Sequence, residues 1–147
     1  MKVALTGATG FIGSHVLTEL QEHGHEVVGL VRDDSQADIV AARGATPVVV
    51  DLYDRATVVS LLRGADGAVH TASPGDDTSA NLDSAVADAA IDAFSGTGRP
   101  YIHISGLWVY GPTRRSPRTP HSTRRLWCPG GSRSSAACLA RAICAAS

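Results

Sequence analysis

The sequence lacks the features that mark several protein classes. Its three cysteines, an odd number without a C-x-x-C pair, indicate neither a disulfide framework nor a zinc site. No apolar run approaches the roughly 20 residues of a membrane span, and the run after Lys2 is too short for a signal peptide, so we expect a cytoplasmic protein. The net charge of −1 gives no overall field to attract nucleic acid or a membrane surface. At 147 residues, the chain can bury one core without a structural metal.

Charged residues are distributed unevenly along the chain. Residues 1–113 hold 6 of the basic and all 14 of the acidic residues, whereas residues 114–147 hold seven arginines and no Asp, Glu or Lys. All three cysteines also lie in the second segment. This change of composition predicts a domain over residues 1–113 and a separate tail over residues 114–147.

The tail is rich in Arg, Ser, Pro and Ala, and only residues 136–146 have the composition of a short helix. One interpretation is a disordered basic arm for nucleic acid, because arginines neutralise phosphates. The tail has little interleaved aromatic character, however, and its composition is that of a GC-rich message translated out of frame. We therefore favour a loss of the reading frame after about Thr113. The coding DNA, read in the other frames, tests this interpretation.

Short apolar runs alternate with helical patterns over the first hundred residues. Such alternation requires right-handed crossovers, so it predicts an α/β fold with a doubly wound parallel sheet in the order 3-2-1-4-5. The predicted strands cover residues 2–6, 26–31, 46–50, 67–71 and 100–105.

The helical segments between these strands carry recognisable start and stop signals. Ser35 is the predicted cap of the second helix, and Asp54 is the predicted cap of the third. The first helix has one apolar stripe, and the fourth has another that runs to about Phe94. The stripe of the first helix consists of Ile12, Val16, Leu17 and Leu20, and that of the fourth of Leu82, Val86, Ala89, Ala90 and Ala93.

The first strand-to-helix turn reads T-G-A-T-G-F-I-G over residues 6–13. Gly7 permits a tight turn, Gly10 allows backbone N–H groups to approach a pyrophosphate, and Gly13 allows the helix to pack closely on the sheet. The helix N-terminus adds its dipole to the attraction for an anion. The alternative is a glycine-rich turn that binds no ligand. We expect the side chains of Phe11 and Ile12 to pack in the first helical turn.

At these residues the sequence resembles the extended and atypical short-chain dehydrogenase/reductase family, the NAD-dependent epimerase/dehydratase group, whose fingerprint is T-G-x-x-G-x-x-G. The resemblance extends to Asp51-Leu52, to the segment His70–Ser73, to Asn81 and to residues 104–111. It implies the N-terminal half of a Rossmann-type fold, with the C-terminal substrate domain missing. The cofactor-binding residues that it implies are Gly7, Thr9, Gly10, Phe11, Ile12, Gly13, Asp51, Leu52, Thr71, Ala72, Ser73 and Asn81.

The choice between NAD and NADP depends on the residue after the second strand. An acidic residue there binds the ribose 2′-hydroxyl of NAD, but this sequence has Arg32. A guanidinium matches a 2′-phosphate, so NADP is favoured over NAD. Asp33 and Asp34 would repel a 2′-phosphate and weaken this preference, and a solvated Arg32 is the alternative.

The catalytic residues of the family are not matched. Its members use a Ser or Thr together with a Tyr-x-x-x-Lys pair, in which the lysine lowers the pKa of the tyrosine. Tyr110 is the last tyrosine here and Lys2 the only lysine, so this pair is absent. Gly106 stands in the register of the Ser or Thr, and Ser105 precedes it as the remaining candidate catalytic hydroxyl. The resemblance implies an oxidoreductase or epimerase by ancestry that is catalytically incompetent as this chain. The alternative is a non-catalytic module that senses NADP.

The missing half also leaves part of the sheet without its usual cover. We expect the apolar side chains of Val69, Ile102 and Ile104 to be partly exposed, which would permit self-association. The small-molecule substrate is not indicated. His23 and His25 are expected to be solvated rather than to bind a metal.

Overall fold

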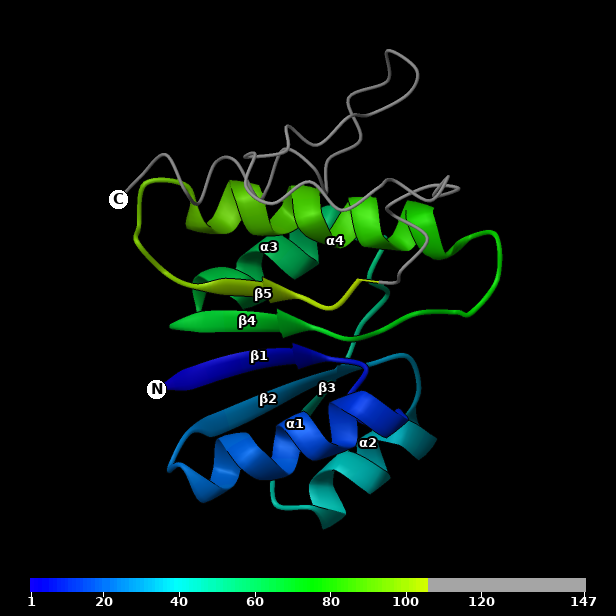
Figure 1. The fold of residues 1–147 in the computed structure, drawn as a ribbon, viewed down its shortest axis with the longest axis vertical. Coiled ribbons are helices and arrows are strands. Elements are labelled where there is room, and N and C mark those ends of the chain that lie inside the picture. The colour runs from blue at the N-terminus through cyan, green and yellow to red at the C-terminus, as the bar shows by residue number, and fades with distance from the viewer. Residues whose placement is uncertain (106–147) are drawn as a thin grey trace, which may run out of the picture.

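A computed structural model describes residues 1–105 of the chain (Figure 1). This part contains a parallel sheet whose strands run in the order β3-β2-β1-β4-β5, which confirms the predicted topology. The strands are β1 (Lys2–Thr6), β2 (Glu26–Val31), β3 (Thr46–Val49), β4 (Gly67–His70) and β5 (Tyr101–His103). The helices are α1 (Phe11–Glu22), α2 (Asp34–Ala42), α3 (Arg55–Arg63) and α4 (Ser79–Phe94).

The helices lie in two layers, with α3 and α4 on one face of the sheet and α1 and α2 on the other (Figure 1). Successive strand residues face opposite sides, so the sheet contributes to two separate cores. In β1, Ala4 packs with α3 and α4, whereas Val3 and Leu5 pack with α1 and α2. Both faces of the central strands are therefore buried, as their nearly unbroken apolar runs require.

Helix α4 confirms the predicted stripe. The five residues of this stripe are all buried, and three of them are alanines, which permit α4 to lie close to α3. Arg55 of α3 joins the two helices at their outer surface, with its guanidinium 2.7 Å from the Asp92 carboxylate and 3.9 Å from that of Asp88. The Asp54 cap of α3 is also as predicted, and its side chain accepts a hydrogen bond from the Thr57 N–H.

One prediction about the helix caps was wrong. The cap of α2 is Asp33 rather than Ser35, because the Asp33 carboxylate accepts from the Gln36 N–H and from the Ser35 hydroxyl. These hydrogen bonds hold the pKa of Asp33 below its usual value. In the stripe of α1, Leu17 is buried and Val16 and Leu20 pack partly buried against the same core, whereas Ile12 is 49% exposed.

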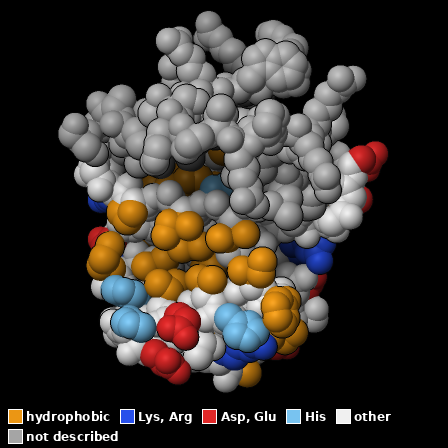
Figure 2. All heavy atoms as spheres, in the orientation of Figure 1, with side chains coloured by type: hydrophobic (Ala, Val, Ile, Leu, Met, Phe, Trp, Pro, Cys, Tyr) orange, Lys and Arg blue, Asp and Glu red, His pale blue; other side chains and the backbone are white. Residues whose placement is uncertain are grey.

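An apolar groove lies on the α1 face of the sheet, lined by residues of α1, of β4 and of the segment around β5. Figure 2 shows the hydrophobic side chains that gather on this face of the molecule. Ile102 and Ile104 are exposed by 54% and 42%, as expected, but Val69 is buried because it belongs to the α1-side core. The groove is lined by Phe11, Ile12, Val16, Leu20, Val69, Ile102 and Ile104, with His15, Glu19, His23 and His25 beside them.

Candidate functional site

The carboxyl ends of the strands meet along one edge of the sheet. The register places Thr6 of β1 beside Leu30 of β2 and beside His70 of β4, and His70 in turn beside His103 of β5. In doubly wound sheets, ligands bind at this edge, next to the strand where the direction of winding reverses. Here that strand is β1. It is followed directly by the glycine-rich strand-to-helix turn within residues 6–13, the glycine turn.

Gly7 and Gly13 are packed against their surroundings. Gly7 has a φ of +72°, and a Cβ on it would lie 2.6 Å from the backbone nitrogen of Ala72. A Cβ on Gly13 would lie 2.0 Å from the Gly7 carbonyl oxygen. These two positions therefore exclude every side chain, which accounts for the turn and for the close approach of α1 to the sheet.

Gly10 differs, because among residues 1–105 a Cβ there would meet only the Gly7 carbonyl oxygen, at 3.3 Å. Gly10 caps α1 without a side-chain hydrogen bond, and the first hydrogen bond of the helix runs from the Ser14 N–H to the Gly10 carbonyl. The N–H groups of residues 11–13 precede this bond and point out of the helix end. Free N–H groups at a helix N-terminus attract an anion, and the small Gly10 allows a ligand to approach them. This arrangement fits the pyrophosphate of a dinucleotide.

The side chains of Phe11 and Ile12 do not pack in this turn as expected. Phe11 is 85% exposed, with its ring 5.1 Å from that of His15, and Ile12 is half-exposed on the side of the apolar groove. The structure thus presents both backbone and side chains of the first helical turn at the surface.

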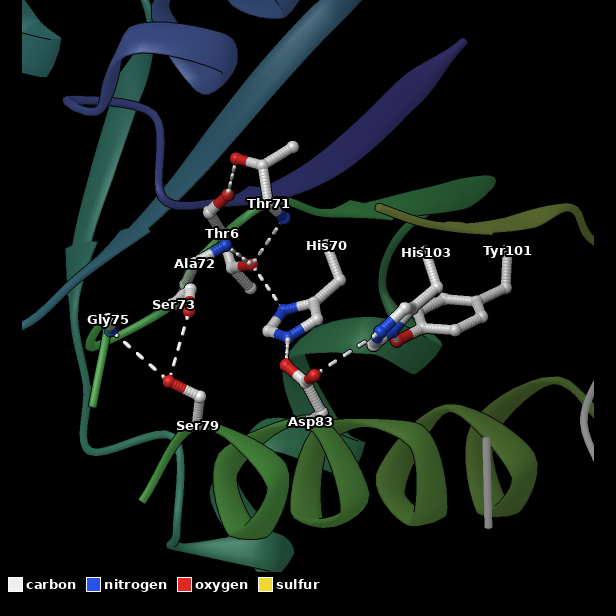
Figure 3. Close-up of polar contacts among 10 residues, drawn as sticks. All are labelled: Thr6, His70, Thr71, Ala72, Ser73, Gly75, Ser79, Asp83, Tyr101 and His103. Atoms are coloured by element: carbon white, nitrogen blue, oxygen red, sulfur yellow. Dashed lines mark hydrogen bonds and ion pairs between the residues drawn. The ribbon is translucent and has the colours of Figure 1, made fainter. Parts of the chain in front are cut away.

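The end of β4 lies directly against the glycine turn. The Thr71 hydroxyl donates to the Thr6 carbonyl at 2.7 Å, and the backbone N–H groups of Thr71 and Ala72 point to the Thr6 hydroxyl oxygen at 3.3 and 3.4 Å (Figure 3). Three of the predicted cofactor residues, Gly7, Thr71 and Ala72, are therefore neighbours, although 64 or more positions separate Gly7 from the other two in the sequence.

A network of polar side chains extends from Thr6 through His70 to Asp83 of α4 and to β5 (Figure 3). Thr6 Oγ1 lies 2.6 Å from His70 Nδ1, and His70 Nε2 lies 3.3 Å from Asp83 Oδ1. The second oxygen of Asp83 lies 3.7 Å from His103 Nε2, and the Tyr101 hydroxyl lies 3.2 Å from His103 Nδ1.

Burial determines the protonation states of His70 and Tyr101 in this network. Desolvation, helped by the adjacent His103 ring, lowers the pKa of His70 to about 4, so its ring is neutral at pH 7. Burial and the Asp83 carboxylate raise the pKa of Tyr101, which keeps its phenol protonated. His103 Nε2 is buried and has no hydrogen-bond partner among the described residues.

Arg32 follows β2 at the same edge of the sheet. Its side chain is exposed and forms no salt bridge with another residue of 1–105, and its backbone N–H points to Gln36 Oε1 at 3.4 Å. The carboxylate of Asp33 is occupied as the cap of α2, where it accepts two hydrogen bonds. Within the described residues, the guanidinium is thus available to meet a ligand, with a carboxylate next to it in the sequence.

The other predicted residues are spread along the edge. Asp51 is exposed and accepts from the Tyr53 N–H, whereas Leu52 is buried in the core beneath it. Thr9 lies half-buried in the glycine turn. Asn81 is exposed near the start of α4, and the Ser73 hydroxyl donates to that of Ser79 at 3.2 Å. Ser105 is exposed after β5, and residues 106–147, with Tyr110 and the tail, lie outside the described residues.

Asp83 of α4 and two side chains of β5, Tyr101 and His103, were not predicted from the sequence. His70 stood in the matched segment, but nothing in the sequence linked it to a carboxylate on α4. A polar residue facing the sheet from an otherwise apolar helix face was the available signal, because such a residue needs a buried partner.

Two kinds of feature are absent from residues 1–105. No group of three His, Cys, Asp or Glu side chains is arranged to bind a metal ion. No helix in the described part is both long enough and apolar enough to cross a bilayer.

Comparisons with known proteins agree with the geometry. A family model described as NAD(P)H-binding matches residues 7–127. An uncharacterized protein of Schizosaccharomyces pombe is 40% identical over 109 residues, which cover 71% of this chain and 37% of that protein. The UDP-Glc/GlcNAc 4-epimerase of Campylobacter jejuni has a TM-score of 0.70 at 25% identity, covering 98% of this chain and 49% of that one.

An NADPH-dependent quinone oxidoreductase of Escherichia coli, solved with NADPH, is similar at 31% identity and a TM-score of 0.53, over 62% of this chain and 33% of that one. The chain therefore spans half or less of the length of each of these relatives. From the glycine turn, the sheet order and these matches, we conclude that the chain belongs to the NAD(P)H-binding family, within the NAD-dependent epimerases/dehydratases and extended short-chain dehydrogenases/reductases.

Proposed function

We propose that the chain binds a nicotinamide dinucleotide at the carboxyl edge of its sheet, with the pyrophosphate on the N–H groups that follow Gly10. The observation that carries this proposal is the contrast among the three glycines. Gly7 and Gly13 are closed off by backbone, whereas Gly10 leaves the helix end open to a ligand. The remaining predicted residues, Thr9, Asp51, Leu52, Ser73 and Asn81, lie around the same edge.

Binding is tested by fluorescence titration of the purified chain with NADPH and NADH, with circular dichroism to show that the chain is folded. A folded protein that binds in the micromolar range supports the proposal. A folded protein that binds neither dinucleotide contradicts it.

We propose that NADP is preferred over NAD because Arg32 stands where an acidic residue would select NAD. The Arg32→Ala variant should lose affinity for NADPH by about tenfold and keep its affinity for NADH. Arg43→Ala, which removes an exposed arginine at the end of α2, is the matched control. An NADPH preference that survives in Arg32→Ala contradicts this assignment.

For chemistry, we propose that the 147-residue chain is inactive as an oxidoreductase or epimerase. The bound dinucleotide would supply the hydride, but the chain offers Ser105 without the Tyr-x-x-x-Lys pair that would move the proton. The expected result is dinucleotide binding without turnover when quinones, aldehydes and sugar nucleotides are tested. Turnover that disappears in Ser105→Ala would show that Ser105 suffices and would overturn the proposal.

A second candidate is a non-catalytic module in which NADP occupancy changes a contact with a partner. It is favoured by the same combination of a complete glycine turn and absent catalytic residues. The two candidates differ in one measurement. Added NADPH should change the association of a sensing module with a partner or with itself, whereas it should leave the association state of a chain that only binds the dinucleotide unchanged.

We also propose that a second copy of the chain docks on the apolar groove between α1 and β5. The groove surroundings contain Glu19 together with His15, His23 and His25, so two copies related by a two-fold axis can place a carboxylate of one opposite an imidazole of the other. Ile102 and Ile104 supply exposed apolar area.

A further inference from the structure

The Thr6 hydroxyl has three hydrogen-bond partners, which is as many as one hydroxyl can have. The N–H groups of Thr71 and Ala72 lie 3.3 and 3.4 Å from its oxygen, and His70 Nδ1 lies 2.6 Å away. A hydroxyl has one hydrogen and two lone pairs. The Thr71 N–H is shared with the Thr6 carbonyl oxygen, which also lies 3.3 Å from its nitrogen. Since the two amides can only donate, the hydroxyl lone pairs accept from them and the hydroxyl hydrogen is directed to His70.

This arrangement determines the state of the His70 ring. Nδ1 must be the acceptor, so the single ring hydrogen of the neutral imidazole is on Nε2, which faces Asp83 Oδ1 at 3.3 Å. The Asp83 carboxylate favours this tautomer because it can only accept. Protonation of Nδ1 would place two hydrogens between the ring and Thr6, and the low pKa of the buried ring agrees with this restriction.

The amides held by Thr6 are those that lie against the glycine turn. A Cβ on Gly7 would lie 2.6 Å from Ala72 N, and a Cβ on Gly13 would lie 2.6 Å from Thr71 Oγ1. A small shift of the β4 end would therefore move the turn that presents the N–H groups after Gly10.

We propose that His70 and Asp83 are positioning residues for the dinucleotide site: Asp83 selects the ring tautomer of His70, His70 orients the Thr6 hydroxyl, and Thr6 holds the end of β4 against the glycine turn. This inference depends on the proposed function, because it assigns these side chains to the binding of the dinucleotide. None of the three side chains needs to touch the dinucleotide.

The test compares variants of the folded chain by titration with NADPH. Thr6→Val removes the hydroxyl at nearly constant volume and should weaken binding about tenfold, while Thr6→Ser should stay within about threefold of the wild type. Asp83→Ala should weaken binding by about threefold to tenfold, and Asp83→Asn, which keeps an oxygen acceptor for Nε2–H, should restore most of it. Asp88→Ala on the same helix is the matched control, since Asp88 lies 3.9 Å from Arg55 and not in this chain of contacts.

Nitrogen-15 NMR of the histidine rings provides a readout that a general loss of stability would not produce. The wild type should show His70 as the Nε2–H tautomer at pH 7, and Asp83→Ala should shift this signal and the amide signals of Thr71 and Ala72. Asp88→Ala should leave all three unchanged.

The outcomes separate this inference from the proposed function. If the wild type binds NADPH and the Thr6 and Asp83 variants bind equally well, the positioning role is wrong and the binding site stands. If the wild type binds no dinucleotide, the proposed function fails, and the positioning role is then judged by the ring tautomer and the two amide signals alone. An Nδ1–H tautomer in the wild type would overturn the positioning role in either case.

Discussion

The Cα of Gly7 and the backbone of Ala72 are so close that a methyl group on Gly7 would lie 2.6 Å from the Ala72 nitrogen. Real Cβ atoms do not approach backbone this closely, so one of the two strand ends would have to move. The contact joins the turn after β1 to the end of β4, and its consequences can be measured.

Gly7→Ala should therefore destabilise the fold by more than about 2 kcal/mol, because a left-handed φ adds roughly 1–2 kcal/mol to the steric cost. Gly24→Ala is the control, since Gly24 has a similar φ of +76° but no atom of the residues that the structure describes lies within 4 Å of the place that its methyl group would take. In the Gly24→Ala variant, the free energy of unfolding measured in urea should fall by only about 1 kcal/mol. Equal losses at the two positions would show that the contact with Ala72 is unimportant.

Gly10→Ala should leave the fold intact and damage the binding site. Gly10 has an ordinary φ of −76°, and within the described part of the chain its added methyl group would meet only the Gly7 carbonyl oxygen, at 3.3 Å. We expect unchanged circular dichroism and about a tenfold or greater loss of NADPH affinity, because the methyl group would occupy the approach to the helix end. Wild-type affinity in this variant would place the pyrophosphate elsewhere.

His70 should make stability depend on pH in mildly acidic solution. Its folded pKa of about 4 lies below its ordinary value of 6.5, so between these values the unfolded chain binds more protons. The unfolding free energy should thus be constant above about pH 6.5 and fall by up to about 1.4 kcal/mol per pH unit as the pH drops toward 4. Urea unfolding from pH 4.5 to 7.5 measures this slope, and a slope unchanged in His70→Gln would assign it to other groups.

Arg55 should contribute little despite its close contacts with Asp92. Its side chain is 56% exposed, so solvent screens the ion pair. Arg55→Ala should lower the unfolding free energy by less than about 1 kcal/mol, and by still less in high salt. A loss of several kcal/mol would mean that the aliphatic stem, rather than the charge, holds α3 to α4.

The apolar groove should cause concentration-dependent self-association. Ile102→Lys should shift the protein toward the monomer in sedimentation experiments, because a charge would lie in the contact. Val49→Lys is the control, since Val49 is 49% exposed but lies on β3 at the opposite edge of the sheet. Equal effects of both substitutions, or a monomeric wild type, would contradict the proposed dimer.

Local patterns of the sequence determined the elements and their order. The five strands, the four helices and the cap of α3 follow from periodicity and from residues such as Asp54, whose hydrogen bonds reach only a few positions along the chain. The order 3-2-1-4-5 follows as well, because a parallel sheet with right-handed crossovers allows few alternatives. The glycine turn carries its own signal, since its three glycines stand at fixed spacing between a strand and a helix.

Only the tertiary structure decided which side chains meet. Ser35 and Asp33 are both good caps, and the backbone path after β2 selected Asp33. Phe11 and Ile12 are exposed because the sheet face beside α1 has no further helix over it in residues 1–105. Thr6 and His70 stand 64 positions apart, and Asp83 approaches them from another helix. Contacts of this kind depend on strand register and helix packing, which sum interactions over the whole domain and leave no mark in any short stretch of sequence.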